Sequence, residues 1–288
     1  MTFDKMLKGY QNAVEAYLAS CFTEDLPQKT LFEAMRYSLL AGGKRIRPVL
    51  VLEFCRVCGA DWQKAVPYAA AIEMIHTYSL IHDDLPCMDD DDYRRGRLTN
   101  HKVYGEAQAV LAGDGLLTAA FHTIAAADAD ASVRIKIVEI LSRCAGELGM
   151  VGGQVLDMEG EKQSPNAEIV HDIHRLKTGA LITAACCMGV VAAGGEEAAM
   201  KAAEDYAAAI GLAFQIRDDM LDVLGDADKL GKAVHVDGAK NTFVSVYGIE
   251  RCKELIDLEN EKAFAALQSF EDRGFLEDLT RMLASREF

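Results

Sequence analysis

Apolar residues recur in this chain at intervals of three and four positions, which is the spacing of one face of an α-helix. The first segment carries such a stripe, made of Phe3, Met6, Leu7, Tyr10, Val14, Tyr17 and Leu18. The same periodicity predicts further helices over residues 30–41, 67–84, 105–126, 131–150, 167–193, 197–224 and 250–284. No alternating run of β-branched residues predicts a strand. The pattern therefore predicts an all-α fold.

Proline and glycine mark where these helices begin and end. Pro48 and Pro67 stand at expected helix starts, because proline fits the first turn of a helix. Gly42 and Gly43 should end the preceding helix. No repeat, low-complexity linker or change of composition divides the chain. We therefore expect one large helical bundle, a single domain over residues 1–288.

The composition narrows the class of protein. Half of the 288 residues are apolar, which suffices for a large core, and the net charge of −15 argues against binding to nucleic acid. Residues 1–14 lack the apolar segment of a signal peptide. Residues 178–195 carry no charge, yet they are rich in Ala, Gly, Thr and Cys, so a buried helix is favoured over a membrane span. We expect a soluble, cytoplasmic protein with no transmembrane segment.

The eight cysteines do not form the framework of a small disulfide-rich domain. Cys55 and Cys58 make a single C-x-x-C pair, and no second pair completes a zinc site. Free thiols are the favoured interpretation.

Six aspartates fall within residues 83–92 and repel one another unless cations neutralise them. Acidic runs are often only solvated loops. This one follows an apolar helix, however, and Arg94 and Arg95 come directly after it. It is therefore a candidate cation site.

A second acidic cluster strengthens that hypothesis. Asp218 and Asp222 are four positions apart on one predicted helix face, Asp219 lies between them, and Gln215 precedes them by one turn. Mg²⁺ prefers such hard oxygen ligands and often binds one or two carboxylates together with substrate phosphates. Two such clusters on facing helices would form a magnesium–diphosphate site in a bundle core.

Basic residues gather beside a glycine turn. Lys44, Arg45 and Arg47 follow Gly42-Gly43, where glycine lets an anion approach the backbone and arginine can bind phosphate through two hydrogen bonds. Together with the acidic clusters, this turn predicts a site for two diphosphates.

These segments resemble the signature blocks of the trans-prenyl diphosphate synthases. The blocks are GGKRIRP (42–48), D-D-x-x-x-x-D (83–89) followed by Arg-Arg-Gly, GGQVLD (152–157), KTG (177–179) and FQIRDDMLD (214–222). They occur in the family's order. The resemblance implies the all-helical isoprenoid-synthase fold, three Mg²⁺ per active site with Mn²⁺ as a substitute, and a homodimer.

The resemblance also implies residue roles. The magnesium ligands would be Asp83, Asp84, Asp89, Asp218, Asp219 and Asp222. The allylic diphosphate would contact Arg94, Lys177, Thr178, Gln215 and Lys232. These five residues and four of the aspartates would form the catalytic set; the four are Asp83, Asp84, Asp89 and Asp218. The isopentenyl diphosphate would contact Lys44, Arg47, His76 and Arg95.

Some of these positions keep a plainer interpretation. His76 could be an ordinary buried histidine, and Asp90, Asp91 and Asp92 are expected to form a solvated loop. Gln154 and Asp157 could support the site from behind or simply pack between helices.

Product length should depend on Tyr78, five residues before Asp83. In the family a bulky aromatic residue there tends to stop growth at fifteen carbons, which implies farnesyl diphosphate. The neighbouring sequence also resembles geranylgeranyl diphosphate synthases, so a twenty-carbon product is the alternative. Phe121 would be the next candidate for the floor of the tunnel.

Three other functions remain in view: a phosphohydrolase using His82-Asp83, a terpene cyclase, and a non-catalytic partner subunit. The chain departs from the family pattern in a shortened segment over residues 233–243, which includes Lys240, and in a C-terminus without a basic tail.

Overall fold

The computed structural model describes residues 2–160, 164, 166–230 and 242–285, and the side chains of Asp222 and of residues 224–230 lie outside that description. The chain forms two compact units. The first unit comprises Met1–Glu139 with Val191–Ala193, and the second comprises Ile140–Val190 with Gly194–Phe288. Compact units can belong to one domain, so the single domain over residues 1–288 stays a prediction.

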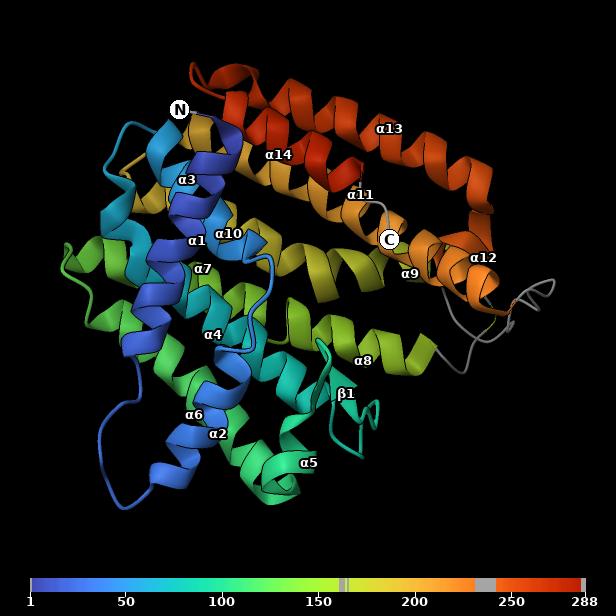
Figure 1. Ribbon diagram of the computed structural model, residues 1–288. Helices are drawn as coiled ribbons and strands as arrows, with labels where there is room; N and C mark the ends of the chain where they lie inside the picture. The colour runs from blue at the N-terminus through green and yellow to red at the C-terminus, as the bar shows by residue number, and fades with distance from the viewer. Residues whose placement is uncertain (1, 161–163, 165, 231–241, 286–288) are drawn as a thin grey trace. The chain divides into compact units, whose positions relative to one another are not determined.

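The first unit is a group of helices around a buried central helix (Figure 1). Its helices are α1 (Phe3–Ser20), α2 (Lys29–Leu39), α3 (Ile46–Val57), α4 (Val66–Asp83), α5 (Asn100–Tyr104) and α6 (Glu106–Ala125), with the 3₁₀ turn η1 (Trp62–Ala65) and the strands β1 (Tyr93–Arg94) and β2 (Arg97–Leu98). Helix α7 (Ala131–Ala145) begins in this unit and ends in the second, and α10 (Ala180–Ala192) also has residues in both.

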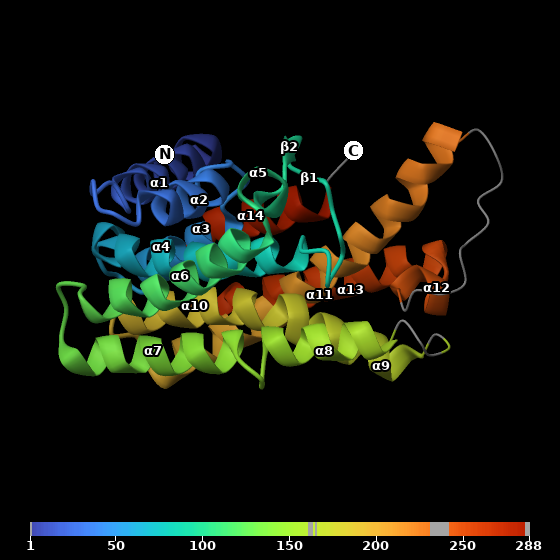
Figure 2. The ribbon, with the colours of Figure 1, turned by 90° about the horizontal axis from the view of Figure 1, so that it is seen from below.

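Helix α4 is the centre of the first unit. Residues from Tyr68 to Ile75 are all buried, as expected of a helix that is apolar on every side. Pro67 stands in its first turn, as the sequence predicts, and the helix ends at Asp83, where the first acidic cluster begins. Helices α4 and α6 lie side by side in both views (Figures 1 and 2). The core of this unit thus anchors the first aspartate motif.

The second unit consists of helices that surround the long helix α11. Helices α11 and α13 run alongside one another (Figures 1 and 2). The elements of the unit are α8 (Met150–Gly160), α9 (Ala167–His174), the π-helical turn η2 (Arg175–Gly179), α11 (Glu197–Leu230), α12 (Phe243–Tyr247), α13 (Ile249–Ala266), the 3₁₀ turn η3 (Leu267–Ser269) and α14 (Gly274–Ala284).

The all-α prediction is confirmed, with a few differences in the elements. The helix expected over 131–150 ends at Ala145, because the chain turns at Gly149 so tightly that a Cβ there would lie 2.0 Å from the carbonyl oxygen of Cys144. The helix expected over 250–284 is interrupted between Ala266 and Gly274. Periodicity alone did not locate either break.

The hairpin between β1 and β2 is the one sheet among the described residues. Its two-residue loop is Arg95-Gly96, and both residues have positive φ values, 54° and 73°. Such φ values at both central positions are those of a type I′ turn, which suits a two-residue hairpin. Two-residue strands are too short to give an alternating pattern in the sequence.

The stretch Ala167–Ala192 is long and apolar enough to cross a membrane by length and composition, although 56% of its most apolar window is buried in the protein. A buried core helix of a soluble protein meets the same criteria. The stretch is therefore weak evidence for a membrane span.

Candidate active site

The glycine-rich turn before α3, residues 42–45, is hydrogen-bonded to an arginine of the hairpin. Gly42 and Gly43 have φ values of 81° and 127°, which favour glycine. The Arg95 side chain donates a hydrogen bond to the carbonyl oxygen of Gly42, and a Cβ added to Gly43 would lie 2.6 Å from Arg95 Nη1. A side chain at position 43 would therefore displace the Arg95 guanidinium from its present place.

His76 lies on α4 within the electrostatic reach of this cationic group. Burial is the main cause that lowers its pKa well below the usual value, and nearby guanidinium groups lower it further; these belong to Arg47, Arg95, Arg45 and Arg94. Its surroundings therefore favour the neutral form of the His76 imidazole. Three of the four predicted contacts of the isopentenyl diphosphate, His76, Arg47 and Arg95, are therefore near one another, and Lys44 is exposed in the turn before α3.

A backbone hydrogen bond joins the two ends of the first aspartate motif. The amide of Asp89 donates to the carbonyl oxygen of Asp83 at 2.9 Å, so the two ends of the motif meet beside the C-terminus of α4. Asp84 is buried and accepts a hydrogen bond from Arg94 Nε at 2.5 Å. Burial raises the pKa of Asp84, and the Arg94 guanidinium opposes that shift. Asp84 therefore fixes Arg94, whereas Asp83 and Asp89 are more accessible.

The remaining aspartates of the run lie on the surface, as expected. Asp90, Asp91 and Asp92 are exposed. Asp92 pairs with Lys102 at 2.7 Å. They form the solvated end of the acidic run.

His82 is turned towards α6. Its Nε2 lies 3.1 Å from the carbonyl oxygen of Val110, and a Cβ added to Gly113 would lie 2.0 Å from the same nitrogen. The ring thus fills a notch that only glycine leaves open. This placement removes the support for a phosphohydrolase that would need His82 and Asp83 on one metal.

Tyr78 lies one turn before His82 and is 7% exposed. Its ring meets that of His82 edge to face, with the centroids 5.7 Å apart. Burial, followed by the charge of Asp83, raises the pKa of the Tyr78 phenol. Tyr78 is thus a large buried side chain just behind the first aspartate motif. Phe121 is half-buried on α6.

In the second unit, the residues of the KTG block stand on a π-helical turn. Such turns are rare and often occur at functional sites. Helix α8 approaches this turn closely, because a Cβ added to Gly153 would lie 2.2 Å from the backbone nitrogen of Lys177. Lys177 Nζ forms an ion pair with Asp157 at 2.5 Å. Asp157 therefore supports Lys177, which favours a supporting role at the site over simple packing between helices.

A chain of hydrogen bonds links this turn to the second aspartate motif. Thr178 Oγ1 donates to Gln215 Oε1 at 2.8 Å, and Gln215 Nε2 donates to Asp219 Oδ1 at 3.4 Å. The other carboxylate oxygen of Asp219 accepts from the backbone amide of Phe243 at 2.8 Å. Asp219 is 7% exposed, whereas Asp218 is half-buried. Asp219 thus orients the Gln215 amide and holds the start of α12.

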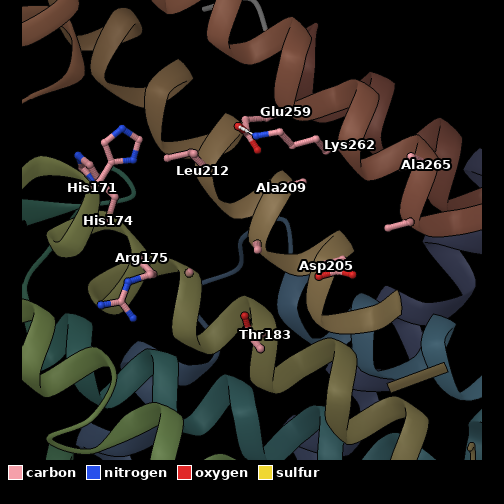
Figure 3. Close-up of a pocket in the computed structure, with 13 residues that line it drawn as sticks. His171, His174, Arg175, Thr183, Asp205, Ala209, Leu212, Glu259, Lys262 and Ala265 are labelled. Carbon is pink, nitrogen blue, oxygen red and sulfur yellow. Dashed lines mark hydrogen bonds and ion pairs between the residues drawn. The ribbon is translucent and has the colours of Figure 1, made fainter. Parts of the chain in front are cut away.

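His174 completes this network and was not found from the sequence. Its Nε2 lies 3.4 Å from Asp219 Oδ2, and its ring stacks on Phe243 with the centroids 5.0 Å apart. The only signal was its position one helical turn before Thr178. A cavity of about 710 Å³ adjoins it, lined also by His171, Leu212 and Lys262 (Figure 3). None of the site residues predicted from the sequence is among those described as lining this cavity.

The donor atoms suit magnesium. Among the described residues, no group of three or more His, Cys, Asp and Glu side chains is arranged as a ready metal site. Mg²⁺ needs only one or two carboxylates, since it keeps waters and binds substrate phosphates. Asp83 with Asp89 in the first unit, and Asp218 in the second, offer such oxygens. The side chain of Asp222, and all of Lys232 and Lys240, lie outside the described residues.

Comparison with known proteins identifies the family. A family model described as polyprenyl synthetase matches residues 28–274. The chain belongs to this family. This polyprenyl synthetase is 43% identical over 293 residues to the farnesyl diphosphate synthase of Geobacillus stearothermophilus, covering 100% of the chain and 99% of the relative.

Other relatives of this polyprenyl synthetase differ in their named product. It is 46% identical over 250 residues to geranylgeranyl pyrophosphate synthase 3, chloroplastic, of Arabidopsis thaliana, covering 84% of the chain and 69% of the relative. Its fold matches the apo crystal structure of an FPP/GFPP synthase from Zymomonas mobilis with a TM-score of 0.89 and 34% identity, over 98% of this chain and 99% of the other. The resemblance seen in the sequence is confirmed.

Proposed function

We propose that this polyprenyl synthetase condenses isopentenyl diphosphate with the allylic substrates dimethylallyl and geranyl diphosphate, giving (2E,6E)-farnesyl diphosphate and diphosphate. The cations near His76 carry this proposal: Arg47 and Arg95 lie within its electrostatic reach and Lys44 is exposed on the adjoining turn, so the group suits a second anion besides the one at the aspartate motifs. A terpene cyclase would not need that second diphosphate site. The full-length likeness to a farnesyl diphosphate synthase supports the product.

The two substrates would use different groups of residues. Lys44, Arg47, His76 and Arg95 would bind the isopentenyl diphosphate. Arg94, Lys177, Thr178, Gln215 and Lys232 would bind the allylic substrate. The magnesium ligands would be Asp83, Asp89, Asp218 and Asp222. Of the other two predicted ligands, Asp84 would act mainly by holding Arg94, and Asp219 by holding Gln215 and α12.

Breaking the allylic C–O bond leaves a carbocation and adds negative charge to the departing diphosphate. Three Mg²⁺, or Mn²⁺ in their place, would supply positive charge to that diphosphate. Arg94 and Lys177 would each add a fixed positive charge to the allylic diphosphate. The hydroxyl oxygen of Thr178 keeps lone pairs to face the carbocation, because its proton is donated to Gln215. The isopentenyl double bond then attacks, and a proton leaves to the released diphosphate.

The buried ring of Tyr78 supports a fifteen-carbon product, because it occupies space behind the first aspartate motif. A geranylgeranyl product is the second candidate, favoured by the likeness to a plant geranylgeranyl synthase. The product is measured by incubating the purified protein with labelled isopentenyl and allylic diphosphates, followed by chromatography of the dephosphorylated products. Fifteen-carbon alcohol is expected; twenty-carbon alcohol would support the second candidate, and no elongation would refute the synthase assignment.

We further propose a soluble, cytoplasmic homodimer. An apolar stripe of the second unit supports an interface: Leu148, Val151, Val155 and Met158 recur at helical spacing and are 45–64% exposed. The acidic surface implied by a net charge of −15 supports a soluble protein without nucleic-acid partners.

A further inference from the structure

Arg45 lies inside the GGKRIRP block, but it is buried, whereas the neighbouring Lys44 is exposed. Its residue is 3% exposed. Its guanidinium donates from Nε to Glu15 at 2.7 Å, from Nη1 to Glu73 at 2.5 Å, and from Nη2 to the carbonyl oxygen of Leu39 at 2.7 Å. The partners belong to α1, α4 and the end of α2. One side chain therefore joins three elements of the first unit.

The backbone of Arg45 is unusual as well. It has a φ of 52° and ψ of 37°, the left-handed region, where it stands at the N-cap of α3. A side chain other than glycine is disfavoured there unless its surroundings hold it in place. Its own ion pairs supply that restraint, so the conformation of the turn depends on the buried guanidinium.

A buried ion pair is weak evidence for stability, because removing both charges from water opposes their attraction. Separating such a pair leaves a buried charge unpaired, which is costly, so the pair can hold the elements that carry it in one arrangement. Glu73 is 2% exposed, so this argument applies fully to the Arg45–Glu73 pair.

The pair lies beside the residues that would bind isopentenyl diphosphate. Arg45 follows Lys44 in the turn and comes two residues before Arg47, in the first turn of α3; Glu73 precedes His76 by one turn of α4. Gln11 on α1 also donates to the carbonyl oxygen of Lys44 at 3.0 Å. The Arg45–Glu73 pair therefore holds the turn against α4, one helical turn before His76.

We propose that Arg45 and Glu73 are positioning residues for the isopentenyl diphosphate subsite: they set the height and rotation of the turn, so that Lys44 and Arg47 face His76. They touch no substrate themselves. This inference rests on the proposed function, because it concerns the same site.

The test compares the kinetics of Arg45→Lys and Glu73→Gln with those of the wild type. Arg45→Lys keeps the charge but cannot reach all three partners of the guanidinium, and Glu73→Gln keeps the size of the side chain but loses the charge that pairs with Arg45. The KM for isopentenyl diphosphate should rise about tenfold to 100-fold, since small misplacements of binding groups have effects of that size. The KM for geranyl diphosphate should change much less, because its proposed contacts lie on other elements.

A double variant separates positioning from folding. Arg45→Met combined with Glu73→Leu removes both charges together, so no buried charge is left unpaired. It should fold, as judged by circular dichroism and Tm, and still show the raised KM. Isopentenyl diphosphate alone should also stabilise it less than the wild type in a thermal shift assay, a measurement that needs no turnover.

The matched control is Glu53→Gln. Glu53 is also fully buried in α3 and accepts a hydrogen bond from Tyr10 at 2.7 Å, but it belongs to no proposed substrate contact. This variant should lower Tm without a selective change of either KM. Equal changes of both KM values in the Arg45 and Glu73 variants, or a change of Tm alone, would overturn the inference. A wild type that does not turn over isopentenyl diphosphate would instead overturn the proposed function.

Discussion

Asp83, Asp84 and Asp89 belong to one motif but have different surroundings. Asp84 is buried against Arg94, Asp83 is half-buried, and Asp89 is exposed. An accessible carboxylate oxygen can take up a metal ion with little desolvation, whereas the carboxylate of Asp84 is buried against the Arg94 guanidinium. We therefore expect the ends of the motif to act on magnesium and Asp84 to orient Arg94.

Asp83→Ala or Asp218→Ala should reduce turnover by about 10³-fold or more, because each removes a charge that holds Mg²⁺ where the diphosphate gains negative charge. The measurement is steady-state kinetics over a range of Mg²⁺ concentrations. Asp92→Ala is the control in the same acidic run, since Asp92 is exposed and pairs only with Lys102 among the described contacts. Full activity in excess chelator would contradict the metal assignment.

Lys44→Ala or Arg47→Ala should raise the apparent KM for isopentenyl diphosphate more than the KM for the allylic substrate. Each variant loses a charge-assisted contact to one diphosphate only. Titration of each substrate at saturating levels of the other measures this difference. Equal effects on both substrates would show that the turn serves another pocket.

Tyr78→Ala should lengthen the product while catalysis survives. It opens space behind the first aspartate motif without touching a charge, and the ring it removes is buried. Chromatography under excess isopentenyl diphosphate should show a shift from fifteen to twenty carbons or more. If the wild type stops at fifteen carbons and the variant does too, Phe121→Ala is the next variant to test.

Among the elements, the contact between α8 and the π-helical turn places Lys177 and Thr178. The backbones meet at Gly153, where even a methyl group would overlap Lys177. The short connection from Thr178 through Gln215 to Asp219 then joins the turn to α11. The GGQVLD block therefore matters mainly because it lets two backbones approach.

Gly153→Ala should lower the free energy of unfolding by about 1–3 kcal/mol, because overpacking forces the backbones apart. It should also reduce turnover, since Lys177 moves with the turn. Gly9→Ala is the matched control: nothing lies within 4 Å of a Cβ added there, in the middle of α1. That change should stabilise the protein by about 0.5–1 kcal/mol through backbone entropy. Urea unfolding of both variants, alongside activity, distinguishes the two outcomes.

At the scale of the whole molecule, the exposed apolar stripe formed by Leu148 and residues of α8 is the interface proposed for the homodimer. Exposed apolar side chains are common singly, but a contiguous row at helical spacing indicates an interface. The stripe is in the same unit as Lys177 and Thr178, so an interface there would support the element that packs on the π-helical turn.

Val151→Glu combined with Val155→Glu should convert a dimer into monomers, because each places a charge in the proposed interface, at sites now 45% and 49% exposed. Light scattering coupled to size-exclusion chromatography measures the mass. Leu258→Glu is the control, since Leu258 is 44% exposed on α13, away from the stripe in sequence. An unchanged mass in the double variant would refute this interface.

The sequence by itself determined the helical class, most helix positions and the family. Apolar periodicity is a local property, and helices such as α1, α4 and α6 follow from it within one or two residues. The signature blocks are likewise contiguous, so they could be recognised without any knowledge of the fold.

Only the tertiary structure decided what each charged side chain does. Arg45 and Arg47 are indistinguishable in the sequence, yet Arg45 points inward because Glu73, 28 residues away, receives it. The sequence does not distinguish Asp219 from Asp218, but in the structure Asp219 contacts the backbone amide of Phe243 and the His174 ring. The π-helical turn and the hairpin were missed for a related reason: packing against Gly153 and Gly43 places them, and no local pattern encodes such contacts.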